Sequence, residues 1–258
     1  MSLRSERILT IKHLAIIGGM GPAAGARFFS VLTGLTPATT DADHLDVTFL
    51  SWPSVIEDRT RFLLGESEQN PAYSICNMMD IAESMAADAL CIPCVTCHSR
   101  RIWQEIETHR TKNNHRYELL SLKDVLAGWC VKNLTPGDSV GVLATNGSVR
   151  CGVFSELLDE CVFDVIFPDE RTQSECVHQA IYHPAWGIKS VNMDLTRVRE
   201  ALFKAMDRFI EQGVSAIVLG CTELPLVVGV RSYKNVAIVD PALELAKKIV
   251  GLRERNVA

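Results

Sequence analysis

Two cysteines follow short apolar runs in the same way. Cys94 closes the run ALCIPC, and Cys221 closes the run AIVLGC. Each run has the length and composition of a short buried strand, so each thiol is expected near the carboxyl end of a strand. Ligands of open α/β sheets bind outside these strand ends. Cys94 and Cys221 are therefore the first candidates for catalytic residues.

The two cysteines also occupy matching places in the two halves of the chain. The first half begins with a strand-like run that leads into GGMGP, and the second with a run that leads into ATNGS. Gly21 precedes Cys94 by 73 residues, and Gly147 precedes Cys221 by 74 residues. This agreement indicates an internal duplication. Two such units packed face to face would place one thiol on each side of a shared crevice.

Two thiols on opposite sides of a substrate suit stereoinversion at an acidic C–H bond. A thiolate removes the proton from one face while a thiol returns a proton to the other face. A free cysteine has a pKa of about 8.5, so one thiol needs cations, hydroxyls or a helix N-terminus nearby to become a thiolate. Thr96, Thr222 and Glu223 follow the cysteines where strand gives way to helix, and this segment could stabilise a thiolate or a substrate carboxylate. Either threonine could equally be a helix N-cap.

Short apolar runs alternate with longer stretches of helical periodicity along the chain. Such alternation predicts an α/β protein with mainly parallel sheets and helices on their faces. Helices are expected near 74–87 and 195–212, the second ending at Gly213. The polar segment 108–118 is expected to be a domain crossover or an exposed loop. The expected strands are 14–17, 47–50, 89–92, 140–144, 165–167, 216–219 and 236–239.

The composition is that of an ordinary globular protein. Of 258 residues, 47% are hydrophobic and 22% are charged, which suits one large domain or two of ordinary size. The net charge of −5 offers no cationic surface to a phosphate backbone, so nucleic acid is not an expected partner. No apolar run reaches the roughly 18 residues of a spanning helix, and residues 1–12 do not resemble a signal peptide. We expect a cytoplasmic protein with no membrane partner.

The nine cysteines are expected to be thiols in a reducing compartment rather than a disulfide framework. Three of them, Cys91, Cys94 and Cys97, form a CxxCxxC run. A structural zinc or iron–sulfur site normally has four ligands, and His98 is the only other candidate nearby. Cys91 lies within an apolar run, where cysteine acts as a small buried hydrophobe. No metal site is expected here.

Several motifs together make the chain resemble the aspartate/glutamate racemase family over nearly its whole length. They are IGGMGP at 17–22, PSxxxDRT at 53–60, Pro93-Cys94 with Thr96 and His98, GIK at 187–189, and GCTE at 220–223 followed by Asp240-Pro241. The resemblance implies racemisation of a small amino acid, with aspartate or glutamate favoured, by two-base proton transfer at the α-carbon. It also implies no pyridoxal phosphate, metal or nucleotide, and a homodimer.

The same resemblance implies two similar Rossmann-like domains related by a pseudo-twofold axis, with the active site in the cleft between them. We assign residues 1–118 and 226–258 to the first domain, which carries Cys94, and residues 119–225 to the second, which carries Cys221.

The resemblance also assigns the site residues. Cys94 and Cys221 are the two bases. Arg59 meets a side-chain carboxylate, a role that suits arginine because its guanidinium binds a planar carboxylate through two parallel N–H bonds. Lys189 lies at the edge of the site, and the turn at Met20-Gly21 shapes one wall. The expected substrate-binding residues are Met20, Gly21, Arg59, Val95, Thr96, Lys189, Thr222 and Glu223.

Two positions depart from the family pattern. Relatives usually show PCNTAH, whereas this chain has PCVTCH, so Val95 stands where the family has an asparagine. That asparagine offers an amide to the α-carboxylate of the substrate, and losing a hydrogen bond to a charged group costs about 1.5 to 3 kcal/mol. Trp52 stands where many relatives have a small polar or acidic residue, so it is expected to reshape the pocket. Weakened binding, a changed substrate and lost activity are all open.

Three other functions agree with parts of the sequence. The GMGPAA run fits the GxGxxA turn of nucleotide-binding dehydrogenases, but no acidic residue ends the next strand, and Pro22 lacks the N–H that a pyrophosphate would use. A protein that binds an amino acid or dicarboxylate without racemising it is favoured by Val95 and opposed by the symmetric cysteine pair. A superfamily isomerase or decarboxylase also stays open, since related folds use similarly placed cysteines for maleate isomerisation or decarboxylation.

Overall fold

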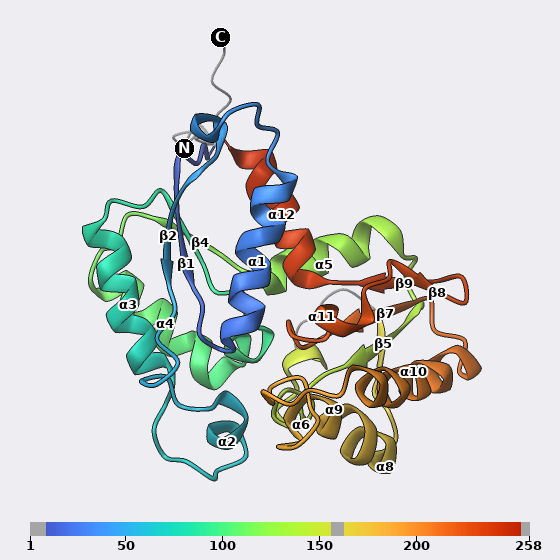
Figure 1. Ribbon diagram of the computed structural model, residues 1–258. Coiled ribbons are helices and arrows are strands. Elements are labelled where there is room, and N and C mark those ends of the chain that lie inside the picture. Colours follow the sequence, from blue (N-terminus) through green and yellow to red (C-terminus); the bar gives the residue numbers. More distant parts are fainter. Residues whose placement is uncertain (1–8, 156–162, 254–258) are drawn as a thin grey trace.

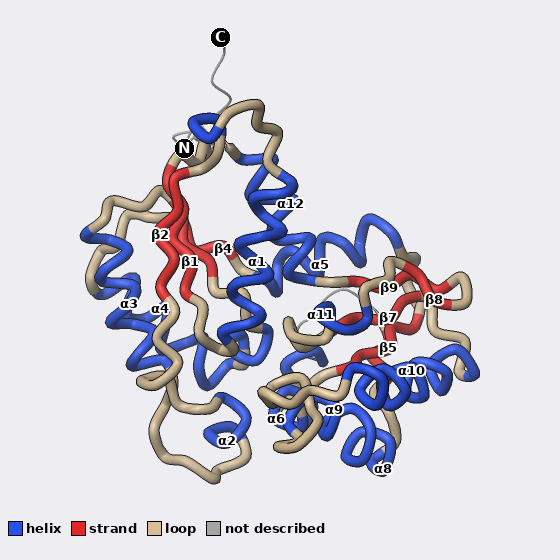
Figure 2. The backbone as a smooth tube through the Cα atoms, in the orientation of Figure 1, coloured by secondary structure: helices blue, strands red, loops and turns tan. Residues whose placement is uncertain are grey.

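The first of two sheets consists of four parallel strands. The computed structural model describes residues 9–155 and 163–253 of the chain. Strand β1 lies between β2 and β3, and β4 lies on the outer side of β3 (Figures 1 and 2). Leu14 pairs with Val47 on one side and with Ala89 on the other, which fixes the register. The strands are β1 (His13–Ile17), β2 (Asp46–Leu50), β3 (Ala89–Cys91) and β4 (Glu118–Leu120).

Both faces of this sheet are buried. Leu14 and Ile16 pack with Phe28 of α1 in one apolar cluster, whereas Ala15 and Ile17 pack with residues of α3 in another. Alternate side chains of a strand point to opposite faces, so a continuously apolar strand needs cover on both sides. Helices α1 and α12 lie on one side, α3 and α4 on the other (Figure 1). Their bounds are α1 (Pro22–Leu35), α3 (Ala72–Ser84), α4 (Arg100–Lys112) and α12 (Pro241–Leu252).

The second sheet repeats the strand order of the first. Strand β5 lies between β6 and β7, and β9 follows β7, just as β1 lies between β2 and β3 with β4 beyond. A short strand, β8, is added at the edge, antiparallel to β9. The predicted α/β fold of two similar units with mainly parallel sheets is therefore confirmed. The strands are β5 (Ser139–Leu143), β6 (Asp164–Ile166), β7 (Ala216–Leu219), β8 (Ser232–Tyr233) and β9 (Val236–Val239).

A long amphipathic helix covers one face of the second sheet. Helix α10 (Leu195–Glu211) directs Met206 and Phe209 into the apolar cluster beneath it. Its N-cap is Asp194, whose carboxylate accepts the backbone N–H of the first turn. The helix ends before Gly213, which has φ +74° and so takes a conformation that glycine adopts at little cost. The predicted helix and its glycine end are both confirmed.

The chain returns from the second sheet to the first through α12. Asp240 begins this helix, and its carboxylate accepts the backbone N–H groups of Ala242 and Leu243. The same carboxylate forms a 2.7 Å ion pair with Arg27 of α1. One side chain therefore caps α12 and joins it to the neighbouring helix.

The predicted division of the chain differs from the observed packing at two places. It assigns residues 226–258 to the first domain, but β8 and β9 pair with the second sheet, and α12 alone of these elements packs against α1. It assigns 119–225 to the second domain, but α5 (Leu122–Asn133) packs against α12. Ile16 of the first sheet and Val142 of the second belong to one apolar cluster. The two units thus share part of their interior.

Short helices surround the region between the two sheets. Among them, α2, η2 and α6 contact one another and come from both halves of the chain. Within the described ranges, no helix has the length and apolarity needed to cross a lipid bilayer. The short elements are η1 (Asp41–Asp43), α2 (Arg59–Leu63), η2 (Val95–His98), α6 (Asn146–Arg150), α8 (Glu170–Thr172), η3 (Gln173–His178), α9 (Gln179–Tyr182) and α11 (Pro225–Val228).

Candidate active site

A closed pocket lies where the carboxyl ends of β3 and β7 meet. Cys94 lies three residues after β3 and Cys221 two residues after β7. Thr222 Oγ1 donates a 3.0 Å hydrogen bond to the carbonyl of Pro93, which joins the two strand ends. The pocket is lined by Met20, Arg59, Cys94, Val95, Thr96, Thr145, Tyr182, Lys189, Cys221, Thr222 and Glu223. Both predicted catalytic residues and most predicted binding residues thus converge from two separate sheets.

Cys94 is a buried thiol in surroundings that favour its ionised form. It precedes η2 as the N-cap residue. The pKa of Cys94 is lowered to about 6, chiefly by a hydrogen bond from the Cys97 thiol and then by the positive charges of Arg59 and Lys189, while burial acts in the opposite direction. Cys94 is therefore the thiolate of the pocket at neutral pH.

Cys221 has the opposite character. Burial and the neighbouring Glu223 carboxylate raise the pKa of Cys221 to about 12, and its thiol donates to Glu223 Oε2 over 3.6 Å. Cys221 therefore keeps its proton over the physiological range. One pocket then holds a proton acceptor from one unit and a proton donor from the other, which is the arrangement that proton exchange across two faces of a carbon requires.

Lys189 and Glu223 form an ion pair within the pocket. The Lys189 ammonium lies 2.8 Å from Oε1 and 2.6 Å from Oε2 of Glu223. Gly21, the one predicted residue that does not itself line the pocket, lies against this pair. A side chain at Gly21 would collide with the Glu223 carboxylate, so the glycine leaves room for the ion pair.

The pocket is nearly filled by its own side chains. Its open volume is only about 10 Å³, which is about the room that a single water molecule needs. A small amino acid therefore enters only if side chains or whole units move apart. Separation of Lys189 and Glu223 would open space, because their charged groups meet in an ion pair and both residues line the pocket.

Arg59 is the buried cation of the first unit. Its Nη2 donates to the carbonyl of Met20 over 3.0 Å, and its Nη1 donates to the carbonyl of Glu57 over 3.4 Å. Its Nε has no hydrogen-bond partner among the described residues. A buried guanidinium N–H without an acceptor is costly, and a carboxylate is the acceptor that matches it best.

A chain of buried hydroxyl groups crosses from one unit to the other beside the thiols. Thr96 lies 3.0 Å from Ser148, which lies 3.2 Å from Thr145 (distances between hydroxyl oxygens). Thr60 donates to Thr145 over 3.2 Å and accepts from Tyr182 over 3.3 Å. Of these residues, only Thr96 was predicted as a site residue. The ATNGS turn and the DRT motif contain three of the others, so these three residues could have been predicted from the motifs.

Val95 and His98 have structural contacts. Val95 is 3% exposed and belongs to the apolar cluster that spans the two units, while it also lines the pocket. His98 accepts the backbone N–H of Leu122 at Nε2 and therefore donates from Nδ1 to the carbonyl of Cys94. Burial lowers the pKa of His98 to about 4. A neutral His98 thus positions the backbone of Cys94, which agrees with its omission from the catalytic set.

The structure corrects the expectation for Trp52. Its side chain is 44% exposed, and it is not among the residues that line the pocket. The backbone N of Trp52 lies near Gly19, which belongs to the GGMGP turn. Trp52 therefore does not reshape the pocket directly.

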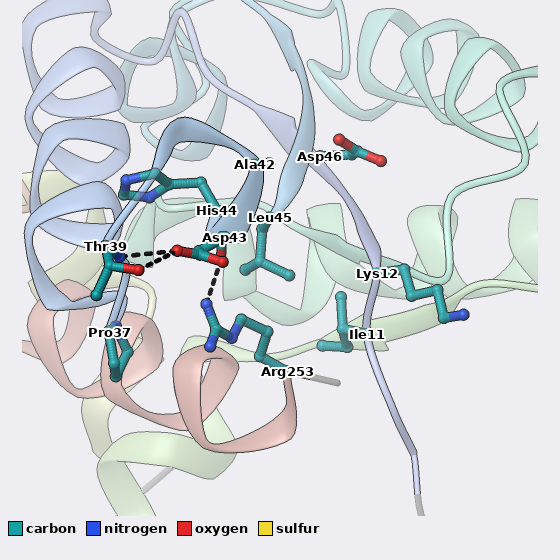
Figure 3. A pocket seen from close by; sticks show the side chains of 10 residues that line it. All are labelled: Ile11, Lys12, Pro37, Thr39, Ala42, Asp43, His44, Leu45, Asp46 and Arg253. Atoms are coloured by element: carbon teal, nitrogen blue, oxygen red, sulfur yellow. Dashed lines mark hydrogen bonds between the residues drawn. The ribbon is translucent and has the colours of Figure 1, made fainter. Parts of the chain in front are cut away.

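A larger hollow of about 390 Å³ lies at the opposite, amino-terminal ends of β1 and β2 (Figure 3). Its polar groups bind one another: Asp43 accepts hydrogen bonds from Thr39 and Thr40, and Arg253 donates to the carbonyl of Asp43. These bonds to Thr39 and Thr40 hold the pKa of Asp43 well below its usual range. No cysteine lines the hollow, and its Asp43 and Arg253 already serve the local fold.

The family relationship follows from a comparison with known proteins. The sequence profile of the Asp/Glu/hydantoin racemase family matches residues 17–249. The chain belongs to this racemase family. The match includes both cysteines, the glycine turn, Arg59 and Lys189.

Solved racemases share the fold over almost the whole chain. The aspartate racemase of Picrophilus torridus superposes with a TM-score of 0.75 at 26% identity, covering 93% of each chain. An aspartate racemase homologue from Pyrococcus horikoshii superposes with a TM-score of 0.68 at 18% identity, covering 94% of this chain and 99% of the other. In sequence, a glutamate racemase of Pseudomonas paraeruginosa is 27% identical over 122 residues, which is 45% of this chain and 41% of that protein.

The CxxCxxC run of this family member contributes to packing rather than to a cluster of metal ligands. Cys91 is fully buried in the apolar cluster around β1 and β3. Cys97 is also fully buried, and its Sγ lies 3.2 Å from Sδ of Met20. Within the described ranges, these cysteines do not form a group of potential ligands, and no disulfide joins them.

Proposed function

We propose that the chain is a cofactor-independent racemase of a small amino acid, with aspartate or glutamate favoured. The observation that carries the proposal is the pocket itself, in which a thiolate from one unit and a thiol from the other reach a common space from two strand ends. Binding alone has no use for such a pair. Family membership supports the same class of reaction.

The proposed reaction begins at Cys94. Its thiolate takes the proton from the α-carbon on one face, and the electron pair of the C–H bond passes into the α-carboxylate. The Cys221 thiol then gives its proton to the opposite face, which leaves Cys94 as a thiol and Cys221 as a thiolate. The reverse reaction starts from that state and converts the other enantiomer. Exclusion of water protects the carbanionic intermediate, and the small volume of the pocket suits this need.

The charged groups of the pocket favour a substrate with two carboxylates. Arg59 presents a buried Nε–H without a partner among the described residues, and Lys189 presents an ammonium that now pairs with Glu223. We propose that one substrate carboxylate binds Arg59 and that the other replaces Glu223 on Lys189. Thr96 and the backbone N–H groups after each cysteine add hydrogen-bond donors around the same space, whereas the Thr222 hydroxyl lines it and donates to the Pro93 carbonyl.

The alternative is a family member that binds an amino acid or dicarboxylate without racemising it, or one that catalyses a related isomerisation or decarboxylation. Val95 favours this alternative, because an apolar side chain lines the pocket where relatives offer an amide to the α-carboxylate. The retained pair of cysteines, one ionised and one protonated, argues against this alternative. A homodimer, a cytoplasmic location and the absence of a cofactor stay predictions from the sequence.

Proton NMR in D2O tests the proposal. The protein is incubated with single L-amino acids, and loss of the α-proton signal is followed beside the loss of optical purity. We expect both with aspartate or glutamate. Cys94→Ser and Cys221→Ser should each slow racemisation by at least about 100-fold, as removal of a general base or acid does, whereas Cys76→Ser on α3 is the matched control outside the pocket and should not. No exchange with any amino acid would favour the binding protein.

A further inference from the structure

A second group of side chains with metal-binding chemistry lies on the α3–α4 side of the first sheet, outside the thiol pocket (Figure 1). His109 Nε2 lies 2.7 Å from Asp80 Oδ1, and His115 Nε2 lies 3.0 Å from the same oxygen. One ligand atom from each of the three residues falls within 4.8 Å of the others. In the described part of the chain, no other group of three or more histidine, cysteine or acidic residues is arranged in this way.

The three residues come from three separate segments. Asp80 lies in the last part of α3, His109 in the last turn of α4, and His115 in the turn between α4 and β4. Two imidazoles aimed at one carboxylate oxygen present two nitrogen ligands and one oxygen ligand to a common point. This set suits a divalent transition-metal ion such as zinc, which binds three protein ligands and a water molecule in many sites.

Neighbouring groups hold His115 in the required orientation. His115 Nδ1 lies 2.7 Å from the hydroxyl of Tyr117, and both residues are buried. Histidine ligands normally use their second ring nitrogen for such a contact, which directs the first nitrogen toward the metal. The Asn113 amide nitrogen lies 3.2 Å from both ring nitrogens of His109 and donates to the His109 carbonyl, so it does not select one ring nitrogen. His115 is therefore the imidazole whose orientation a neighbouring side chain fixes.

We propose that Asp80, His109 and His115 bind one divalent transition-metal ion, with zinc the ion of choice, and that this ion clamps α3, α4 and the turn before β4. Metal–ligand bonds of about 2.0 to 2.2 Å in a tetrahedron separate ligand atoms by roughly 3.3 Å. The two contacts of Asp80, at 2.7 and 3.0 Å, need to open by a few tenths of an ångström. Asp80 has a half-exposed side chain, so it can move by this amount. The two histidine nitrogens lie within 4.8 Å of each other and need to approach by up to about 1.5 Å. The ion would have no part in the thiol chemistry.

Calorimetric titration of the chelator-treated protein with ZnCl2, in a buffer without phosphate, tests the proposal. We expect saturable binding of one ion per chain at this site, lost in Asp80→Asn and in His109→Ala. With excess zinc the melting temperature of the wild type should rise by several degrees, and that of these two variants should not. His44→Ala is the matched control, because it removes a histidine outside the cluster and should leave binding unchanged. All three substitutions affect side chains that are at least partly exposed, so the variants are expected to fold.

Zinc could also bind to the thiols of the pocket, and cobalt separates the two sites. Co²⁺ bound to thiolate absorbs strongly in the near ultraviolet, whereas Co²⁺ bound to two imidazoles and a carboxylate shows only weak visible bands. We expect the weak visible bands, lost in His109→Ala and retained in Cys94→Ser. No saturable binding, or binding that is unchanged in both Asp80→Asn and His109→Ala, would overturn the proposal and leave the cluster as ion pairs between Asp80 and the two histidines.

Discussion

Cys97 is expected to control the ionisation of Cys94. The Cys97 sulfur lies 3.2 Å from Sδ of Met20, and a hydrogen bond from its S–H to the Cys94 sulfur is the largest cause that lowers the pKa of Cys94. An anionic sulfur is a stronger acceptor than a thioether. A hydrogen bond to a charged group contributes about 1.5 to 3 kcal/mol, and about 1.36 kcal/mol corresponds to one pKa unit. Cys97→Ala should therefore raise the pKa of Cys94 from about 6 by about one to two units.

This rise in the pKa of Cys94 can be measured directly. Thiolate absorbance in the ultraviolet, recorded against pH and corrected with Cys94→Ser, reports the ionisation of Cys94. At pH 7 the thiolate fraction should fall from about nine-tenths in the wild type to between roughly one half and one tenth in Cys97→Ala. Racemisation started by Cys94 should fall in proportion at this pH and recover as the pH rises.

Cys97→Ser is the matched control for this prediction. Its hydroxyl keeps a donor of similar size, so the pKa of Cys94 should stay close to the wild-type value. Cys97 is fully buried, and the alanine variant also leaves a small cavity that lowers stability; the serine variant separates that effect from the electrostatic one. An alanine variant with the wild-type titration curve would refute the reasoning and leave Arg59 and Lys189 as the groups that ionise Cys94.

Three further predictions follow from the contacts of the site and of the helix layer. Arg59→Lys keeps the charge but loses the planar fork, so kcat/KM for the racemised amino acid, measured by chiral chromatography, should fall roughly tenfold to a hundredfold; an unchanged value would remove Arg59 from substrate binding. Racemisation in the direction that uses Cys94 as the base should rise with pH through about 6 and stay high far above neutrality, because Cys221 keeps its proton up to about 12; a pH profile that falls between 7 and 9 would contradict the assignment. Asp240→Ala removes both the cap of α12 and the partner of Arg27, so the free energy of unfolding, measured with urea, should fall by about 2 to 4 kcal/mol. A fall below about 0.5 kcal/mol would show that neither contact stabilises the fold.

Of the nine strands among the described residues, seven could be predicted because they are short apolar runs. Strands β4 and β8 have only three and two residues and were missed, and the order of the strands in each sheet was not predicted. Helix α10 was predicted within one residue at its carboxyl end, since its apolar periodicity and Gly213 are both strong signals. The segment 108–118 was predicted as a crossover or loop, whereas α4 continues as far as Lys112. Only Ile102 and Ile106 of α4 are buried, so its apolar stripe is too sparse to mark where the helix ends.

The thiol pair could be predicted from the duplication, but the rest of the pocket depends on how the two units pack. Tyr182 lies on a short helix without a recognisable motif, and its hydroxyl reaches Asp58 of the other unit over 3.1 Å. Trp52 was expected to reshape the pocket because it stands where many relatives have a small polar or acidic residue, yet its side chain is 44% exposed and does not line the pocket. Neither outcome follows from sequence spacing, because each depends on a contact between residues far apart in the chain.

In the proposed reaction, the ion pair of Lys189 and Glu223 would link substrate entry to the protonation of the thiols. While the pair is formed, Glu223 occupies space in the pocket and raises the pKa of Cys221. A substrate carboxylate that binds Lys189 would release Glu223, and movement of its charge away from Cys221 would lower the pKa of that thiol. Cys221 would then become a better acid at the moment when it must give up its proton. The same displacement of Glu223 would enlarge the pocket. Substrate binding and the fall in the pKa of Cys221 would therefore occur together.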